Sequence, residues 1–224
     1  LCRIDAEEFD RRTMSLKENY PAPAYYSLLN MLSSHDTERI TTLMGGAPTR
    51  HEVDRDYQAQ FKLNDNQKEV ARKRTKVAYG MVMTMPGVPC IFYGDELAIE
   101  GYGDPFCRMC FPWDKMDQID PMSEMRDWMK SLISLRKSDE AFSTGEIEAV
   151  YKLGHTYAYM RKGDSSKYLV VVNPEGVHRD IRLDVARYNI EKLSSVISTG
   201  YENNHSSDDG IFYIKTEPYS VTVY

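Results

Sequence analysis

The chain has 224 residues, of which 42% are hydrophobic and 28% are charged, so it can form one large or two small folded domains and is too apolar to be disordered. Its 28 basic and 34 acidic residues give a net charge of −6, which removes the electrostatic support that nucleic-acid binding needs. The most apolar stretch, residues 78–94, is interrupted by two prolines and a glycine and cannot span a bilayer, so we expect neither nucleic acid nor a membrane as a partner.

The first 142 residues alternate between helical hydrophobic periods and short apolar runs. Three segments predict helices: residues 7–19, 66–85 and 120–136, the last with Asp120 as its cap. Two short apolar runs that end in polar loops predict buried strands: residues 28–32 and 88–93. This alternation is typical of a parallel α/β barrel or a doubly wound sheet, in which active-site groups lie on loops at the carboxyl ends of strands.

The hydrophobic period changes from helical to two near Ser143. Seven segments then predict strands: residues 146–153, 156–161, 168–173, 180–183, 192–197, 211–215 and 220–224. Turn-forming clusters separate them at hairpin-like spacing, which is typical of an antiparallel β-sandwich. The sequence therefore predicts an α/β unit over residues 1–142 and an all-β unit over residues 143–224.

Two loops that follow the predicted strands carry most of the polar functional groups. The first contains His35 and Asp36, and the second runs from residue 93 to residue 114 and contains Asp104 and Arg108. In the second loop Cys107 and Cys110 also form a C-x-x-C pair. No second Cys or His pair follows at zinc spacing, so we interpret these as two loop thiols and predict no metal site.

Two runs closely resemble signature segments of the alpha-amylase family of glycoside hydrolases. Residues 30–40 (NMLSSHDTERI) resemble the fourth signature region of that family, and residues 87–96 (GVPCIFYGDE) are similar to its eighth barrel strand. The Gly-x-x-Asp-Pro-x-Cys-Arg loop and the Pro-Trp-Asp after it resemble the neopullulanase and cyclomaltodextrinase branch. The resemblance implies the carboxyl-terminal part of such an enzyme: the last quarter of a TIM (β/α)8 barrel followed by an antiparallel β-sandwich.

The resemblance also implies roles for the loop residues. Asp36 corresponds to the third catalytic carboxylate, which holds sugar hydroxyls and helps to distort the ring at the cleavage subsite, and His35 hydrogen-bonds the same sugar. Asp104 and Arg108 resemble a pair that contacts the next glucose. Structural interpretations of the same residues remain. Asp36 could simply cap the following helix, and Asp104 and Arg108 could form an ion pair within their loop. Asp95, at the end of the second strand, corresponds with its neighbour Glu96 to structural positions at the barrel rim.

The reacting carboxyl groups of a retaining hydrolase are not visible in this sequence. Such an enzyme needs a nucleophile and an acid about 5–5.5 Å apart, and the family carries them upstream of its His-Asp motif. The 34 residues before His35 predict one helix and one strand, so we expect both groups to be missing and the chain alone to lack turnover. Asp184 lies in a segment that mimics the nucleophile region, but it falls in the period-two half, where an amphipathic strand explains it.

The implied parent activity is retaining hydrolysis of α-1,4 glucosidic bonds in starch, maltooligosaccharides or cyclodextrins, with an α-glucan oligosaccharide as ligand. Members of the family often bind calcium near the barrel, but the retained residues do not cluster carboxylates, so we expect no cofactor in this chain. Strands without barrel neighbours would expose edges and apolar faces, which predicts self-association or docking of the missing barrel portion.

Two rival interpretations stay open. One is a non-catalytic carbohydrate-binding or interaction module built on the sandwich, and the other is an unrelated α/β enzyme that uses Asp95 and Glu96. The sequence leaves the cellular compartment open.

Overall fold

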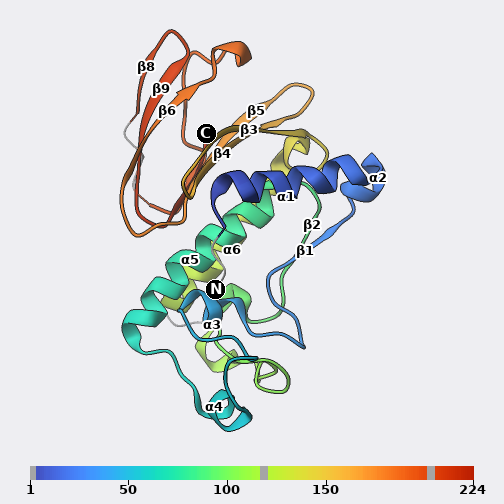
Figure 1. The fold of residues 1–224 in the computed structure, drawn as a ribbon, viewed down its shortest axis with the longest axis vertical. Coiled ribbons are helices and arrows are strands. Elements are labelled where there is room, and N and C mark those ends of the chain that lie inside the picture. The colour runs from blue at the N-terminus through green and yellow to red at the C-terminus, as the bar shows by residue number, and fades with distance from the viewer. Residues whose placement is uncertain (1–3, 117–120, 201–204) are drawn as a thin grey trace.

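The computed structural model describes residues 4–116, 121–200 and 205–224. The first half of the chain is mainly helical (Figure 1). Its elements are α1 (Ala6–Asn19), α2 (Ala22–Tyr25), β1 (Leu29–Met31), α3 (Ile40–Met44), α4 (Arg55–Gln60), α5 (Asp65–Thr84), β2 (Val88–Cys90), the 3₁₀ turns η1 (Asp95–Leu97) and η2 (Trp113–Lys115), α6 (Pro121–Ser138) and η3 (Glu140–Phe142). The cap expected at Asp120 lies outside the described residues.

Local capping explains where the long helices begin and end. The side chain of Asp5 accepts the Glu8 amide at 2.8 Å and caps α1. Asn64 and Gln67 form a reciprocal capping box at the start of α5. That helix ends at Thr84, two residues before Pro86, because a proline cannot donate the next backbone hydrogen bond.

The second half of the chain consists of antiparallel strands. They are β3 (Glu146–Leu153), β4 (Thr156–Lys162), β5 (Lys167–Asn173), β6 (Arg179–Asp184), β7 (Ile197–Ser198), β8 (His205–Asp208), β9 (Ile211–Thr216) and β10 (Ser220–Val223), with the turn η4 (Ala186–Tyr188) after β6. One sheet has the order β3-β4-β5-β10-β7 and the other the order β6-β9-β8. The expected change from helices to antiparallel strands is confirmed.

A core lies between the two antiparallel sheets. It contains alternate side chains of β4 and β5 on one side and of β6 and β9 on the other: Ala158, Met160, Leu169, Val171, Ile181, Leu183, Phe212 and Ile214. The intervening side chains of the five-stranded sheet point the opposite way. This is the two-residue period that the sequence shows in this half.

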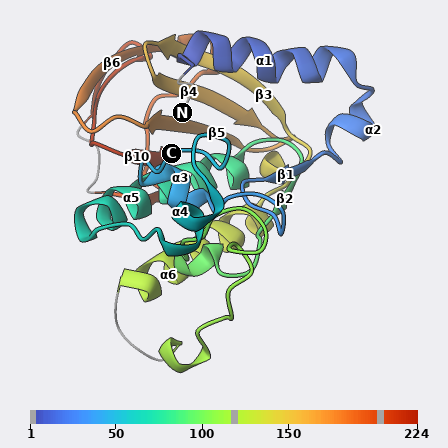
Figure 2. The same cartoon turned by 60° about the horizontal axis from the view of Figure 1, so that its bottom comes forward.

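The opposite face of the five-stranded sheet packs against the helices of the first half. One continuous core joins residues of α5 and α6 to residues of the sheet, among them Tyr79, Leu132, Tyr159, Val170 and Val221. In Figure 1 both helices run beneath the sheet, and in Figure 2 α1 lies along β3. The helical and antiparallel parts are therefore held together by shared apolar burial.

The strands β1 and β2 correct the expectation of two buried strands. They form a parallel pair in which Leu29 lies opposite Val88, at a place away from the antiparallel sheets (Figures 1 and 2). Leu29 is 64% exposed, Met31 53% and Val88 45%. Within the described residues no further strand joins this pair, so its outer faces and edges stay open, as barrel strands without neighbours would leave them.

Short elements account for the other differences. The sequence did not predict α2, α4 or β8, and of the strand expected over residues 192–197 only Ile197 is found in a strand, the two-residue β7. Such short elements depend on contacts with distant residues more than on their own periodicity. Among the described residues no helix has the length and apolar character to cross a bilayer.

Candidate functional site

The loop between β1 and α3 presents His35 and Asp36 to solvent. Ser34 donates its amide to Thr37 Oγ1 at 3.1 Å, which folds the loop back on itself. The amide of Ile40 at the start of α3 donates to Ser33 Oγ at 2.9 Å. Asp36 is therefore not the cap of α3, which removes the plain interpretation of this residue and leaves its carboxylate free for other contacts.

The structure brings the four predicted site residues into one cluster. Oδ2 of Asp36 lies 3.1 Å from His35 Nε2, and its Oδ1 lies 3.3 Å from Arg108 Nη2. The same Arg108 nitrogen lies 3.1 Å from Asp104 Oδ1, so one guanidinium joins the two carboxylates. The Asp104–Arg108 pair is thus an ion pair within its loop that also extends to the neighbouring loop.

Backbone contacts hold the two loops against each other. Arg108 Nε donates to the carbonyl of His35 at 2.9 Å, and the thiol of Cys107 donates to the same oxygen at 3.0 Å. Arg50 donates to the carbonyl of Asp36, and Arg55 on α4 donates to that of Asp104 at 2.7 Å. The cluster therefore rests on four separate hydrogen bonds to main-chain oxygens.

A buried ion pair lies behind the cluster. Arg39 and Asp95 have side chains that are both 0% exposed and 3.3 Å apart, and Asp95 Oδ2 accepts the hydroxyl of Tyr79 at 2.6 Å. Burial raises the pKa of Asp95, against the opposing effects of the Tyr79 hydrogen bond and of the Arg39 charge. Burial and the neighbouring Asp95 also raise the pKa of the Tyr79 hydroxyl. The side chain of Asp95 does not reach the surface from this position, which argues against its use as a catalyst.

The front of the cluster is open and polar. The side chains of His35 and Asp36 are 67% and 62% exposed, and those of Asp104 and Arg108 are about half exposed. Each carboxylate uses one oxygen on Arg108 and keeps further lone pairs for other donors. Such a surface can accept hydrogen bonds from neighbouring hydroxyl groups and can donate from the guanidinium and imidazole.

The other candidate residues are dispersed. Asp184 ends β6 in the three-stranded sheet and accepts the amide of Ala186 at 3.3 Å, as expected for a strand that runs into a turn. Cys107 is buried, which raises the pKa of its thiol, whereas Cys110 is exposed. Among the described residues, no three His, Cys, Asp or Glu side chains are grouped so that they could hold a metal ion.

Three arginines around the cluster were not predicted as site residues. Arg39 lies inside the segment of residues 30–40 that resembles the family signature. Its side chain, however, contacts residues more than 50 positions away in the sequence. Arg50 and Arg55 lie in a polar stretch with no periodic signal. Their contacts with the cluster could be found only from the folded chain.

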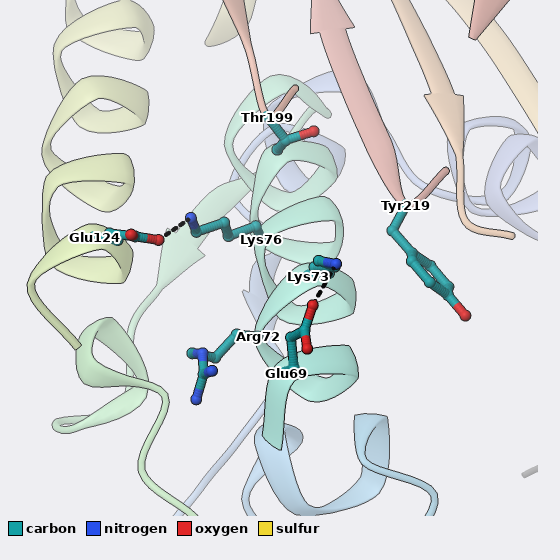
Figure 3. A pocket seen from close by; sticks show the side chains of 7 residues that line it. All are labelled: Glu69, Arg72, Lys73, Lys76, Glu124, Thr199 and Tyr219. Atoms are coloured by element: carbon teal, nitrogen blue, oxygen red, sulfur yellow. Dashed lines mark hydrogen bonds and ion pairs between the residues drawn. The ribbon is translucent and has the colours of Figure 1, made fainter. Parts of the chain in front are cut away.

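A separate hollow of about 370 Å³ lies between α5, α6 and the end of the five-stranded sheet (Figure 3). Its wall includes Lys73, paired with Glu69 at 2.7 Å, and Lys76, which is 3.6 Å from Glu124. These pairs neutralise most of the charge that lines it. None of the predicted site residues takes part in its lining.

The chain is similar to several characterised proteins. It is 34% identical over 196 residues to an amylopullulanase of Thermoanaerobacter thermohydrosulfuricus, a match that spans 83% of this chain and 12% of that protein. It is 31% identical over 184 residues to neopullulanase 2 of Thermoactinomyces vulgaris, spanning 81% of this chain and 27% of that protein. The chain therefore spans about an eighth to a quarter of these relatives.

Solved structures share the fold. The debranching enzyme of Nostoc punctiforme superposes with a TM-score of 0.77 at 22% identity, over 98% of this chain and 40% of that one. A second structure of that enzyme, soaked with acarbose, gives a TM-score of 0.74. No family model matches the sequence.

Proposed function

This chain belongs to the alpha-amylase family of glycoside hydrolases, and from that premise we propose that it forms the carboxyl-terminal part of a retaining α-glucan hydrolase. Residues 1–142 are the last strand–helix units of the catalytic (β/α)8 barrel, and residues 143–224 are the β-sandwich that follows it. The intact enzyme cleaves α-1,4 glucosidic bonds of starch, maltooligosaccharides or cyclodextrins.

The observation that carries this proposal is the convergence of two loops on Asp36. His35 and Arg108 contact its two oxygens, and the exposed side of the carboxylate faces solvent. A carboxylate placed in this way accepts hydrogen bonds from vicinal sugar hydroxyls, and these bonds strengthen as the ring flattens toward an oxocarbenium-like transition state. Asp104 and Arg108 then contact the adjacent glucose of the same chain.

The reacting groups come, in this proposal, from polypeptide other than residues 1–224. The relatives are four to eight times longer than the matched segment. In this chain Asp36 and Asp104 are both ion-paired with the same guanidinium, that of Arg108. The chain alone therefore binds a glucan weakly and does not hydrolyse it.

Binding of maltoheptaose, followed by titration calorimetry or ligand-observed NMR, tests the sugar-binding role. Asp36→Asn keeps the shape of the side chain and removes its charge, so we expect an affinity loss of about 10- to 100-fold. The matched control is Asp180→Asn on the exposed side of β6, which should leave the affinity unchanged. Binding that survives Asp36→Asn would instead place the sugar on the antiparallel sheets and favour the carbohydrate-binding module.

Release of reducing sugar from maltoheptaose or β-cyclodextrin tests whether the chain alone hydrolyses glucosidic bonds. We expect no release by the purified chain. Turnover that Asp184→Ala abolishes would contradict this and would make that strand-end carboxylate a nucleophile.

The exposed face of β1 and β2 supports the barrel assignment and suggests what covers it. We propose that the remaining barrel strands cover Leu29 and Met31 in the intact protein, and that a second copy of the chain does so in their absence. Light scattering should then show association that Leu29→Ser/Met31→Ser reduces. Leu153→Ser on β3, an exposed leucine elsewhere, is the control and should not change the mass.

A further inference from the structure

Arg39 sends its side chain from the start of α3 into the second loop of the site. Its Nε donates to the carbonyl of Cys107 at 2.9 Å, and its Nη1 donates to the carbonyl of Tyr93. The same Nη1 lies 3.3 Å from Asp95. One guanidinium, three residues after Asp36, thus contacts both ends of the segment that leads to Arg108.

Two aromatic rings and an ion pair hold this guanidinium in place. Its central carbon lies 4.2 Å from the centre of the Phe92 ring and 4.6 Å from that of Tyr93, both within cation–π range. Asp95 is itself held by the Tyr79 hydroxyl of α5 at 2.6 Å. The arginine therefore cannot shift without breaking its contacts with two aromatic rings and with Asp95, which α5 holds through Tyr79.

The contacts of Arg39 lead directly to the sugar-facing cluster. Cys107, whose carbonyl it holds, donates its thiol to the carbonyl of His35 at 3.0 Å, and the next residue, Arg108, donates to the same oxygen at 2.9 Å. The backbone amide of Arg39 also donates to the carbonyl of Gly101 at 2.9 Å. The spacing between the His35 loop and the Arg108 loop is therefore set through Cys107.

We propose that Arg39 is a positioning residue that holds Arg108 opposite Asp36 through Cys107, without touching the sugar itself. The identity of the ligand rests on the proposed function. The positioning role rests on the Arg39 contacts and not on which ligand binds.

The buried ion pair of Arg39 and Asp95 contributes more to the position of the loops than to the stability of the fold. A buried ion pair usually stabilises a fold no better than apolar residues of similar volume, because both charges lose their hydration. Within the described part of the chain, Nη2 of Arg39 is buried without a hydrogen-bond partner, which adds a cost. A lysine could not replace the arginine, because a single ammonium cannot span the Cys107 and Tyr93 carbonyls.

The test measures the exposure of the Cys107 thiol and the stability of the whole chain in separate experiments. In Arg39→Met/Asp95→Asn the charges are removed while the asparagine still accepts the Tyr79 hydroxyl. Because the Cys107 and Tyr93 carbonyls lose their donor, we expect the unfolding midpoint to fall, but by no more than in the control Arg136→Met. Labelling of the Cys107 thiol by a disulfide reagent should be faster by about tenfold in peptide maps, and maltoheptaose affinity should be lower by about tenfold. Arg39→Lys should show the same loosening and provides the test if the double variant does not fold.

The matched control is Arg136→Met, which removes a partly buried arginine that also donates to carbonyl oxygens, here those of Met83, Met85 and Gly87. It should lower stability and leave Cys107 labelling and sugar affinity as in the wild type. Native Cys107 labelling with unchanged affinity in both Arg39 variants would overturn the positioning role. Unchanged affinity in Asp36→Asn would overturn the proposed function instead, and the labelling rate would still decide the role of Arg39.

Discussion

The hydroxyl of Tyr157 on β4 donates a hydrogen bond of 2.9 Å to the carboxylate of Asp10 on α1. Lys152 on β3 donates to the other oxygen of Asp10 at 2.7 Å, and the ring of Phe9 packs edge-on against Tyr157. Burial, together with the contact with Asp10, raises the pKa of the Tyr157 hydroxyl. The first helix of the chain is therefore attached to the antiparallel sheet of the second half.

Asp10→Ala should lower the free energy of unfolding by about 1–3 kcal/mol, because it leaves the buried Tyr157 hydroxyl without its acceptor. Urea unfolding measures the change. In a double-mutant cycle with Tyr157→Phe, the double variant should lose less stability than the sum of the two single losses, since removing both partners leaves no buried orphan. Asp180→Ala on the exposed side of β6 is the control. Equal losses in the two alanine variants would show that the α1 contact adds no stability.

The shared core predicts that residues 143–224 do not fold alone. The helix-facing side of the five-stranded sheet buries Tyr159, Val170, Val172, Val221 and Val223 against the first half of the chain. A truncated protein would expose this whole face, and large exposed apolar faces cause aggregation. We expect the truncation to lose cooperative thermal unfolding by circular dichroism and to bind a hydrophobic dye. A cooperative transition would show that the two antiparallel sheets fold without the first half of the chain.

The long elements could be predicted because their signals are local. The helix expected over residues 66–85 is found as Asp65–Thr84, since Asn64 caps its start and Pro86 stops its end. The strand expected over residues 211–215 is found with alternating burial, because one of its faces lies in a core. The strand expected over residues 156–161 is found buried on both faces, because each face lies in a different core. Likewise, the two loops with His35 and Arg108 could be expected to meet, since both follow strands that pair in parallel.

Other features of the fold and of the site depend on contacts between distant residues, which no local sequence pattern encodes. Residues 28–32 have the sequence of a buried strand, but their exposure depends on neighbouring strands, and none joins β1 and β2 within the described residues, so the apolar face is open as expected for barrel strands without neighbours. The Arg39–Cys107 hydrogen bond joins residues 68 positions apart. The attachment of α1 to the sheet also depends on a distant pair, Asp10 and Tyr157, whereas the sequence predicted that helix as part of the α/β unit.

Gly80 lies at a close approach of α5 to the sheet. A Cβ added there would lie 2.5 Å from Cγ1 of Val221 on β10, well inside contact distance. Gly80→Ala should therefore destabilise the protein by about 1–3 kcal/mol through overpacking, although alanine favours a helix by about 1 kcal/mol over glycine. Chemical denaturation of the variant measures the balance.

Val221→Ala provides the compensation, because it removes the methyl groups that the new Cβ would meet. The double variant Gly80→Ala/Val221→Ala should be more stable than the sum of the two single losses predicts. Simple additivity would mean that helix and strand move apart freely at this point.

Asp139, at the junction of α6 and η3, should make stability depend on pH. Its carboxylate accepts hydrogen bonds from the Ala141 amide at 2.8 Å, from Ser166 Oγ at 2.8 Å and from the Tyr168 hydroxyl at 3.0 Å. Partial burial acts to raise its pKa, but the three hydrogen bonds together outweigh it, so the pKa of Asp139 is lowered. The ionised form is therefore favoured more in the folded chain than in the unfolded one.

Because the pKa is lower in the folded state, the unfolded chain binds more protons in acid. The stabilising contribution of Asp139 is fully present above the unfolded pKa of about 3.9 and is lost as the pH falls through the lower folded value. Urea unfolding of wild type and Asp139→Asn should thus differ by a constant amount above about pH 5, and the difference should shrink below about pH 4. The control Asp180→Asn should show no such narrowing. A wild-type advantage that stays the same from pH 7 to about pH 3 would mean that the three hydrogen bonds do not select the ionised carboxylate.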